Sequence, residues 1–325
     1  MSASRLTRRQ VLVGAALGMA TLAAPRAPAR AATGDAAGAR GAGAGAAGTI
    51  TIGGDLVLNR MGFGAMRITG PGIWGEPKDP VEARRVLQRA VELGVNFIDT
   101  ADAYGPDVSE RLIAAALYPY PRGLVIATKG GMIRPAAGEW VADGRPQHLR
   151  EACEGSLQRL KLQRVDLYQL HRIDPNVPLE DSMGELARLR EQGKIRHIGV
   201  SNFSAAELAR ARRVVPVVSV QNRYNIADRS SGDVLEVCAR EGLAFIPWAP
   251  IARGSADSLE NGTNKALESI AAAHGVSVLQ VAIAWLLAKS PAMLPIPGTS
   301  SVAHLEENVA AAGVKLTPVE LAALG

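Results

Sequence analysis

The sequence carries almost no net charge once its first 31 residues are set aside. Those residues contain no acid and hold Arg5, Arg8, Arg9, Arg26 and Arg30. The whole chain has 36 basic and 31 acidic residues, so without these five arginines the two signs balance. A balanced chain has no positive field to attract a polyanion or an anionic lipid surface. Nucleic-acid binding and electrostatic membrane binding are therefore excluded as main functions.

Cysteine is also scarce, with 2 residues in a chain of 325. Cys153 and Cys238 fall far apart in segments with a helical pattern, where small thiols commonly pack in a core. We therefore expect two buried thiols and no disulfide. The sequence also has no cluster of histidine, cysteine and carboxylate residues with metal-ligand spacing, so we expect no metal site.

The apolar stretch near the N-terminus is too short to cross a membrane. It covers residues 11–24, about 14 residues, whereas a spanning helix needs roughly 20. Arg8 and Arg9 precede it, and Ala29-x-Ala31 follows as a cleavage site. Residues 1–31 resemble a twin-arginine signal, which implies export by the twin-arginine translocase to the periplasm or cell exterior. An ordinary secretory signal or an uncleaved anchor are alternatives, and a signal that does not function would leave the protein in the cytoplasm.

Residues 32–48 are almost entirely alanine and glycine and offer little to bury, so we expect a flexible tether. Gly43, Gly45 and Gly48 form a literal G-x-G-x-x-G within it. A dinucleotide-binding fingerprint needs a strand before it and a helix after it, and the tether has neither. We interpret this match as an accident of composition.

From Thr49 onward the pattern becomes regular. The stretch TITIGGDLVLN predicts a β-hairpin that turns at Gly53 and Gly54. Short apolar runs then alternate with amphipathic helices. The runs predict strands at residues 61–65, 96–99, 125–129, 166–170, 196–200, 217–221, 244–248 and 293–296. Helices are predicted at residues 80–93, 150–160, 179–191, 205–213 and 234–240.

Eight strands alternating with helices predict an α/β fold of the (β/α)8 TIM-barrel class over residues 49–325, with the hairpin at its N-terminal side. An open doubly wound sheet is the rival. That fold needs a phosphate-binding loop after its first strand, followed at once by a helix. The segment GFGAMRITGPGIWG has no helix start for several residues, so the barrel is favoured.

Polar residues recur where the predicted strands end, which is where the active site of such a barrel gathers. Asp99 and Tyr104 follow the second strand, Lys129 the third and His171 the fourth. Taken singly, Asp99 could cap a helix, Tyr104 could pack under a loop and His171 could be structural. Lys129 is harder to explain alone, because a buried ammonium is costly without a partner, and Asp99 lies one strand away.

These side chains suit the reduction of a carbonyl group. A carbonyl that receives hydride develops charge on its oxygen and needs a proton. Tyr104 can donate that proton if Lys129 lowers the pKa of its phenol, with Asp99 holding the ammonium. His171 can donate a hydrogen bond that orients the carbonyl. No serine or cysteine nucleophile accompanies the set.

From about Thr49 to its end the chain resembles an aldo-keto reductase. The resemblance is carried by D-T-A-x-x-Y-G at residues 99–105, the lysine after strand three, Leu170-His171, and SNF at 201–203. It implies an NADP-dependent carbonyl reductase in which Tyr104 donates the proton and Asp99, Lys129 and His171 assist. The matching residues implied to bind cofactor are Ser201, Asn202, Gln221, Trp248, Ile251, Arg253, Gly254, Gly298, Thr299, Ser300, His304, Glu307 and Asn308.

One position departs from many relatives, which have an arginine for the 2′-phosphate where this chain has His304. Histidine carries less charge at neutral pH, which weakens attraction for the 2′-phosphate. NADP(H) is nevertheless the expected cofactor, and NAD(H) is the alternative. Within the family the segments at 64–77, 116–129 and 296–311 resemble the bacterial pyridoxal reductase (pyridoxine 4-dehydrogenase) branch. A small aldehyde or ketone is the implied substrate. The alternative function is a non-catalytic nucleotide-binding or regulatory subunit.

Overall fold

The protein is described by a computed structural model that covers residues 43–250 and 263–325. The predicted signal, most of the tether, and three predicted cofactor residues, Ile251, Arg253 and Gly254, lie outside these ranges. All the described residues belong to one compact unit.

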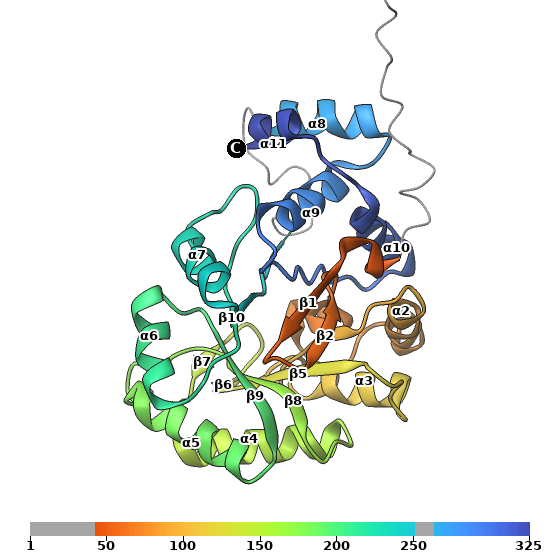
Figure 1. Cartoon of the computed structure of the whole chain (residues 1–325). Helices are drawn as coiled ribbons and strands as arrows, with labels where there is room; N and C mark the ends of the chain where they lie inside the picture. The colour runs from red at the N-terminus through yellow and green to blue at the C-terminus, as the bar shows by residue number, and fades with distance from the viewer. Residues whose placement is uncertain (1–42, 251–262) are drawn as a thin grey trace, which may run out of the picture. The chain divides into compact units, whose positions relative to one another are not determined.

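Seven parallel strands form one curved sheet in the order β11-β10-β9-β8-β5-β4-β3 (Figure 1). Each strand overlaps a predicted one and extends at most one residue beyond it. Their bounds are β3 Phe63–Gly64, β4 Phe97–Asp99, β5 Val125–Gly130, β8 Val165–Leu170, β9 Ile195–Ser201, β10 Ser219–Gln221 and β11 Ala244–Phe245. The match in order and direction confirms the α/β barrel class.

The predicted eighth strand is an irregular extended segment that still closes the barrel. Met293 pairs with Phe245 of β11 as an isolated bridge, and Leu294 N donates to Phe245 O at 2.9 Å. On the other side Gly62 N, next to β3, donates to Pro295 O at 2.9 Å. Prolines at 291, 295 and 297 have no N–H to donate, which explains why no regular ladder forms.

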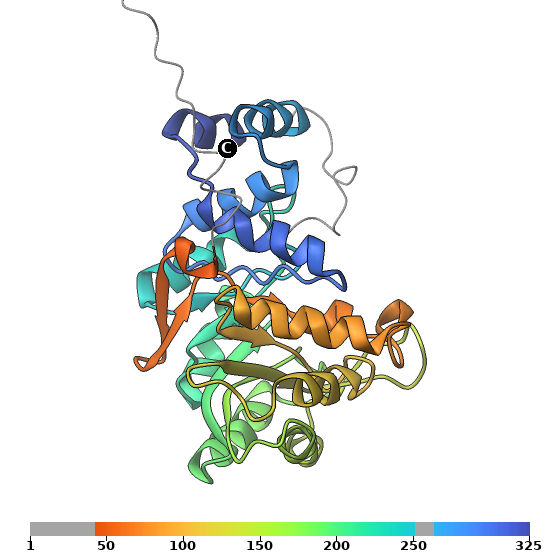
Figure 2. The ribbon, with the colours of Figure 1, turned by 90° about the vertical axis from the view of Figure 1, so that its right-hand side faces the viewer.

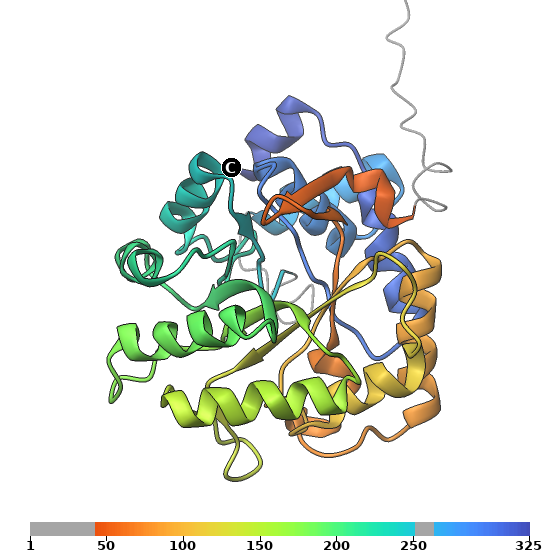
Figure 3. The same ribbon diagram turned by 60° about the horizontal axis from the view of Figure 1, so that its bottom comes forward.

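Helices surround the strands (Figure 3). They are α2 Pro80–Glu92, α3 Val108–Leu117, α4 Pro146–Arg159, α5 Leu179–Glu191, α6 Ala205–Val214, α7 Gly232–Glu241, α8 Thr263–His274, α9 Val278–Lys289, α10 Val302–Ala310 and α11 Pro318–Leu324. Their starts follow local sequence: Asp79 caps α2, and capping boxes begin α6, α9 and α11. Helix α10 packs beside α2, as Figure 2 shows.

The predicted hairpin is confirmed and closes the amino-terminal end of the barrel. Its strands β1 (Thr49–Ile52) and β2 (Leu56–Asn59) pair antiparallel, and Gly53 and Gly54 turn with φ of 62° and 84°. The hairpin lies across the strands in Figure 3. Its apolar face, Ile52, Leu56 and Leu58, packs into the barrel interior against Phe97 and other inward side chains. The opposite end is thereby left for a ligand.

The prediction of a flexible tether is wrong for its last residues. Residues 44–47 form a short 3-10 helix, with Ala44 fully buried and its N–H donating to Leu93 O at 2.8 Å. A side chain at Gly43 would meet Leu93 O at 2.8 Å, so this position requires glycine. Residues 43–48 therefore pack on the barrel, because small residues allow the chain to lie directly on the end of α2.

A second hairpin was not predicted. It consists of β6 (Met132–Ile133) and β7 (Val141–Ala142) and follows β5. Its strands have two residues each, too short for a periodic pattern to reveal. The hairpin brings Trp140 to the carboxyl end of the barrel, where the predicted site lies.

Cys153 and Cys238 are buried free thiols in one helix-lined part of the core, as predicted. Burial raises the pKa of each thiol to about 12, which keeps both protonated and unreactive. Among residues 43–250 and 263–325, no single helix has the length and apolar character to span a membrane, although the bent pair Lys265–His274 and Val278–Lys289 meets both criteria together.

Candidate active site

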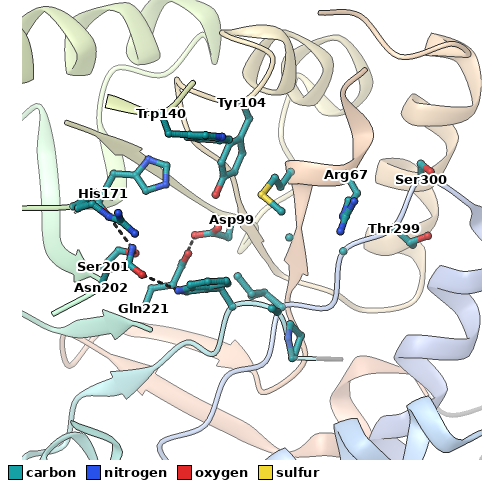
Figure 4. Close-up of a pocket in the computed structure, with 18 residues that line it drawn as sticks. Arg67, Asp99, Tyr104, Trp140, His171, Ser201, Asn202, Gln221, Thr299 and Ser300 are labelled. Atoms are coloured by element: carbon teal, nitrogen blue, oxygen red, sulfur yellow. Dashed lines mark hydrogen bonds between the residues drawn. The ribbon is translucent and has the colours of Figure 1, made fainter. Parts of the chain in front are cut away.

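A cavity of about 540 Å³ opens at the carboxyl ends of the strands (Figure 4). Sequence-predicted residues from six different segments line it. They are Asp99, Tyr104, His171, Ser201, Asn202, Gln221, Trp248, Gly298, Thr299 and Ser300. Parallel strands that end at one rim explain why residues so distant in sequence meet there.

Asp99, Lys129 and Tyr104 form a continuous buried chain at the base of this cavity. Lys129 Nζ donates to Asp99 Oδ1 at 2.5 Å, to Thr100 O at 2.9 Å and to Tyr104 Oη at 3.3 Å. Lys129 is 0% exposed and Asp99 2% exposed. Three acceptors around one ammonium match its three N–H groups, so the charge is satisfied without water.

The pKa values in this chain result from opposing effects. Burial lowers the pKa of Lys129, but Asp99 and Tyr104 outweigh it, so the pKa lies above its usual value and the ammonium stays charged. Burial raises the pKa of Tyr104, while Lys129 opposes that rise. Lys129 therefore acts in the predicted direction, but burial is the larger effect, so the pKa of Tyr104 lies above its usual value.

His171 stands beside Tyr104, with ring centroids 5.8 Å apart in an edge-to-face arrangement. Burial, reinforced by the charges of Lys129 and Arg172, holds the pKa of His171 well below its usual value. The ring is therefore neutral at pH 7. Its Nδ1 is buried with no hydrogen-bond partner among the described residues. A neutral imidazole can still donate from one ring nitrogen to a bound carbonyl oxygen.

Ser201, Asn202 and Trp248 are joined by side-chain hydrogen bonds on the next part of the wall. Asn202 Nδ2 donates to Ser201 Oγ at 3.0 Å and to His171 O at 3.2 Å. Trp248 Nε1 donates to Asn202 Oδ1 at 3.0 Å. Asn202 has φ of 62°, a left-handed conformation that asparagine tolerates better than most residues. The turn lets its amide contact all three neighbours.

Gln221 contributes an acceptor to the cavity. Its Nε2 donates to Asp99 Oδ2 at 2.8 Å and to Gln169 Oε1 at 3.4 Å. Because the amide N–H groups point inward, Oε1 is the atom that remains to meet a ligand. Ser201 Oγ accepts from Asn202, so its hydroxyl hydrogen is the donor left nearby. One donor and one acceptor side by side complement a primary carboxamide, the group carried by nicotinamide.

The predicted adenosine end is less completely assembled. Gly298, Thr299 and Ser300 line the cavity, but His304, Glu307 and Asn308 on α10 do not. His304 is exposed, whereas Asn308 is 4% exposed. Gly298 lies so close to β3 that a side chain there would meet Gly64 O at 2.3 Å. This close approach brings the segment that contains Gly298 directly against β3.

The sequence did not reveal several residues that line the cavity: Gly64, Met66, Arg67, Trp140, Arg172, Ala249, Pro250 and Ile296. Arg67 lies on the side of Thr299 and Ser300 in Figure 4, away from Tyr104 and His171. Arg172 directly follows His171. Two arginines on the wall favour an anionic ligand. The sequence pointed to these arginines only through their neighbours: Arg67 lies in a glycine-rich segment, and Arg172 follows the predicted site residue His171.

Three aromatic rings, those of Tyr104, Trp140 and His171, meet in one corner of the cavity, which we call the ring corner. The Trp140 centroid lies 6.3 Å from those of Tyr104 and His171, with interplanar angles of 74° and 77°. The face of the indole is covered by Arg134, whose guanidinium carbon is 3.8 Å from the ring centroid. Arg134 is 7% exposed and donates to the carbonyl oxygens of Glu139 at 2.7 Å and Ile73 at 3.0 Å. Trp140 is thus held rigidly at the mouth.

The arrangement can transfer a proton to a carbonyl oxygen held between Tyr104 and His171. A neutral donor with a charged, fully bonded ammonium behind it suits general acid catalysis. In the described residues no group of three or more histidine, cysteine or carboxylate side chains is placed to hold a metal ion. The donors and acceptors at Ser201 and Gln221 fit a nicotinamide cofactor, which would supply hydride.

Comparison with known proteins agrees with this chemistry. Residues 60–324 match the model of the aldo/keto reductase family. An uncharacterised oxidoreductase of Schizosaccharomyces pombe is 51% identical over 271 residues, 83% of this chain and 87% of that protein. Pyridoxine 4-dehydrogenase of Escherichia coli is 42% identical over 282 residues, 85% and 96% of the two chains. A Klebsiella pneumoniae aldo-keto reductase solved with NADPH superposes with a TM-score of 0.72 at 26% identity, covering 85% of this chain and 93% of that one.

Proposed function

The chain belongs to the aldo-keto reductase family of oxidoreductases, and we propose that it uses NADPH to reduce a small planar aldehyde, such as pyridoxal, to the alcohol. The observation that carries this proposal is the buried Asp99–Lys129–Tyr104 chain at the base of the cavity. A related Escherichia coli protein named pyridoxine 4-dehydrogenase supports the choice of substrate.

Tyr104 donates the proton in the proposed reaction. As negative charge develops on the carbonyl oxygen, the phenol gives up its hydrogen, and the phenolate is stabilised by Lys129 Nζ at 3.3 Å. Asp99 keeps the ammonium charged and in place. Neutral His171 donates a hydrogen bond to the same oxygen, which fixes the substrate's orientation. In the reverse reaction Tyr104 would act as the base.

The proposed cofactor site uses Ser201, Asn202 and Gln221 for the carboxamide of nicotinamide and Trp248 for its ring. Thr299 and Ser300 would meet the phosphate at the other end, with help from His304. Arg67 adds a cation on that side, which compensates in part for a histidine in place of arginine. The NADPH-bound relative supports NADP(H) over NAD(H).

The ring corner supports a planar substrate. Tyr104, Trp140 and His171 meet at nearly perpendicular angles, so the cavity offers flat walls close to the reacting oxygen. An aromatic aldehyde buries its ring against such walls without immobilising rotatable bonds. A linear aldehyde would lose more conformational freedom on binding.

The proposal is tested by following NADPH absorbance with pyridoxal and with 4-nitrobenzaldehyde, and with NADH in parallel. Turnover of either aldehyde that depends on Tyr104 supports an enzyme. Tight NADPH binding without turnover of any carbonyl in a broad panel would favour the alternative, a nucleotide-binding or regulatory subunit.

We further propose export by the twin-arginine route, on the sequence of residues 1–31 alone. The proposed cofactor site is assembled from strands across the whole barrel, so the cofactor binds only a folded chain, and a route for folded proteins would preserve it. Arg8→Lys with Arg9→Lys should leave active enzyme in the cytoplasm. Equal export of parent and double variant would contradict this assignment while leaving the reductase assignment intact.

A further inference from the structure

Asp99 is held by more than Lys129. Its second oxygen, Oδ2, accepts hydrogen bonds from Gln169 Nε2 at 2.9 Å and from Gln221 Nε2 at 2.8 Å. Gln169 is 0% exposed and Gln221 3% exposed. The carboxylate therefore accepts from a charged ammonium on one oxygen and from two amide donors on the other, and only 2% of the residue is exposed.

Gln169 occupies its place because the strands around it leave room. It lies in β8, in register with Lys129 of β5 on one side and Gly199 of β9 on the other. A side chain at Gly199 would come within 3.0 Å of Gln169 Cγ. Leu167, two residues earlier on the same face, packs in the apolar barrel interior. An amide at the next inward position is thus a departure from the apolar pattern that needs a partner, and Asp99 is that partner.

Gln169 also fixes the orientation of Gln221. Its Oε1 accepts from Gln221 Nε2 at 3.4 Å while its Nε2 donates to Asp99. With both inward partners being acceptors, the Gln221 amide has one favourable orientation, in which nitrogen points inward and Oε1 faces the cavity. Gln169 itself does not line the cavity, so any effect on the reaction passes through its neighbours.

We propose that Gln169 is a positioning residue that couples the carboxamide-binding end of the site to the proton-donating chain. It holds Gln221 in the orientation that accepts from a carboxamide, and it holds Asp99 in the orientation that supports Lys129. This inference rests on the proposed function. Removing the amide frees Gln221 to flip and leaves Asp99 Oδ2 with one donor, which weakens both ends together.

Two variants separate this role from simple packing. Gln169→Met keeps the approximate volume and removes both hydrogen-bonding groups. Gln169→Glu keeps the acceptor for Gln221 but places a second carboxylate beside Asp99. Two titratable groups are placed against position 169: Asp99 on β4, which Gln169 bonds, and Lys129 on β5, which is in register with it. On the other side β9 and β10 present Gly199 and Gln221, which do not titrate.

Only one of the two variants should depend on pH. Gln169→Met should lower kcat about tenfold at every pH, roughly the loss of one hydrogen bond to a charged group. Gln169→Glu should lose more at neutral pH and recover as pH falls, because one carboxyl of the adjacent pair takes up a proton and donates to the other. The measurement is kcat against pH with saturating NADPH and aldehyde.

Cofactor binding gives a second readout that does not depend on turnover. Quenching of tryptophan fluorescence by NADP⁺ should show a Kd raised about threefold to tenfold in Gln169→Met, on the order of one neutral hydrogen bond. In Gln169→Glu the change should be smaller, because Gln221 keeps its acceptor. Thr128→Val is the matched control: Thr128 is equally buried and adjacent to Lys129, but its hydroxyl donates outward to Glu110 at 2.6 Å.

Thr128→Val should lower stability to urea without changing the shape of the pH profile. The proposal is overturned if Gln169→Met keeps kcat and Kd within twofold of the parent, or if both Gln169 variants and the control show parallel pH profiles. Should Gln169→Met not fold, Gln169→Glu measured at two pH values decides alone. A parent that binds NADP⁺ but reduces no aldehyde would refute the proposed function instead, and the Kd comparison would still test Gln169.

Discussion

The two ends of the cavity differ in how far their polar side chains are buried and bonded to one another. At the catalytic end Asp99, Lys129 and Tyr104 are buried, and Lys129 is bonded to both of the others. At the other end Ser300 and His304 are exposed. Preorganised polar groups stabilise a transition state because they need not rearrange as charge develops. Exposed groups can adjust to a ligand but contribute less each. Substitutions should therefore have large effects at the first end and small ones at the second.

The largest effect is expected from Tyr104→Phe. The change removes one oxygen from the buried chain and leaves the ring, so kcat should fall by about 10²–10⁴, the usual contribution of a positioned acid. NADPH affinity should stay nearly unchanged, because no predicted cofactor contact is lost. Steady-state kinetics with pyridoxal and a fluorescence titration with NADPH give the two numbers. Turnover equal to that of the parent would remove Tyr104 from the mechanism.

A smaller effect is expected where Arg134 supports Trp140. Arg134→Met removes the cation from the indole face and four hydrogen bonds to carbonyl oxygens. Trp140 should lose its fixed position, and kcat/KM for 4-nitrobenzaldehyde relative to hexanal should fall about tenfold, the value of one well-placed ring contact. Arg145→Met is the control, because Arg145 follows the same hairpin but has an exposed side chain, paired with Asp143, that does not contact the indole. A ratio that changes equally in both variants would argue against the ring corner as the selective element.

His171 offers a test by pH. Its pKa in the folded state is held well below the usual value, chiefly by burial. As pH falls below about 6.5, this residue binds a proton in the unfolded chain but stays neutral in the folded protein. Stability should therefore decrease with falling pH by at most about 1.4 kcal/mol per pH unit from this group. His171→Asn should show a shallower decrease in urea midpoints between pH 7 and pH 5. Parallel decreases would mean that His171 is protonated in the folded state.

The smallest effect is expected at His304. His304→Arg adds a permanent cation with a geometry suited to phosphate, so the preference for NADPH over NADH should rise. Because the side chain is exposed, we expect only about a twofold to fivefold change in the ratio of the two Kd values. His304→Gln serves as the control without charge. A change of a hundredfold would show that the adenosine end is as tightly organised as the catalytic end.

The same contrast explains what the sequence could predict. The catalytic residues follow strand ends, and buried polar groups at strand ends are visible in a linear pattern. Gln169 was also visible, as a polar residue on the inward face of an apolar strand, but no spacing rule names its partner 70 residues away. Trp140 could not be placed, because its position depends on Arg134 and on carbonyl groups of three separate loops.

The fold class was predicted correctly, and only the regular geometry of the last strand was not. The apolar run at 293–296 was recognised, but its flanking prolines remove the donors that would make it a regular strand. The alanine- and glycine-rich residues 44–47 gave the opposite error. They look like a linker by composition, yet their small size is what lets them pack on Leu93 and the end of α2.

The proline-rich segment that closes the barrel is also where the barrel should open most easily. One backbone hydrogen bond, from Gly62 N to Pro295 O, and one from the Arg60 side chain to Met293 O join it to the β3 side. By contrast, β8 and β9 are paired along five residues. Amide hydrogens at this seam should exchange with solvent sooner than those of the central strands. Because the cavity has Gly64 on one side of the seam and Gly298 on the other, a bound dinucleotide would bridge it. Bound cofactor would then hold the seam closed and slow the exchange of its amide hydrogens first. It would also stabilise the whole barrel against unfolding in proportion to its binding free energy.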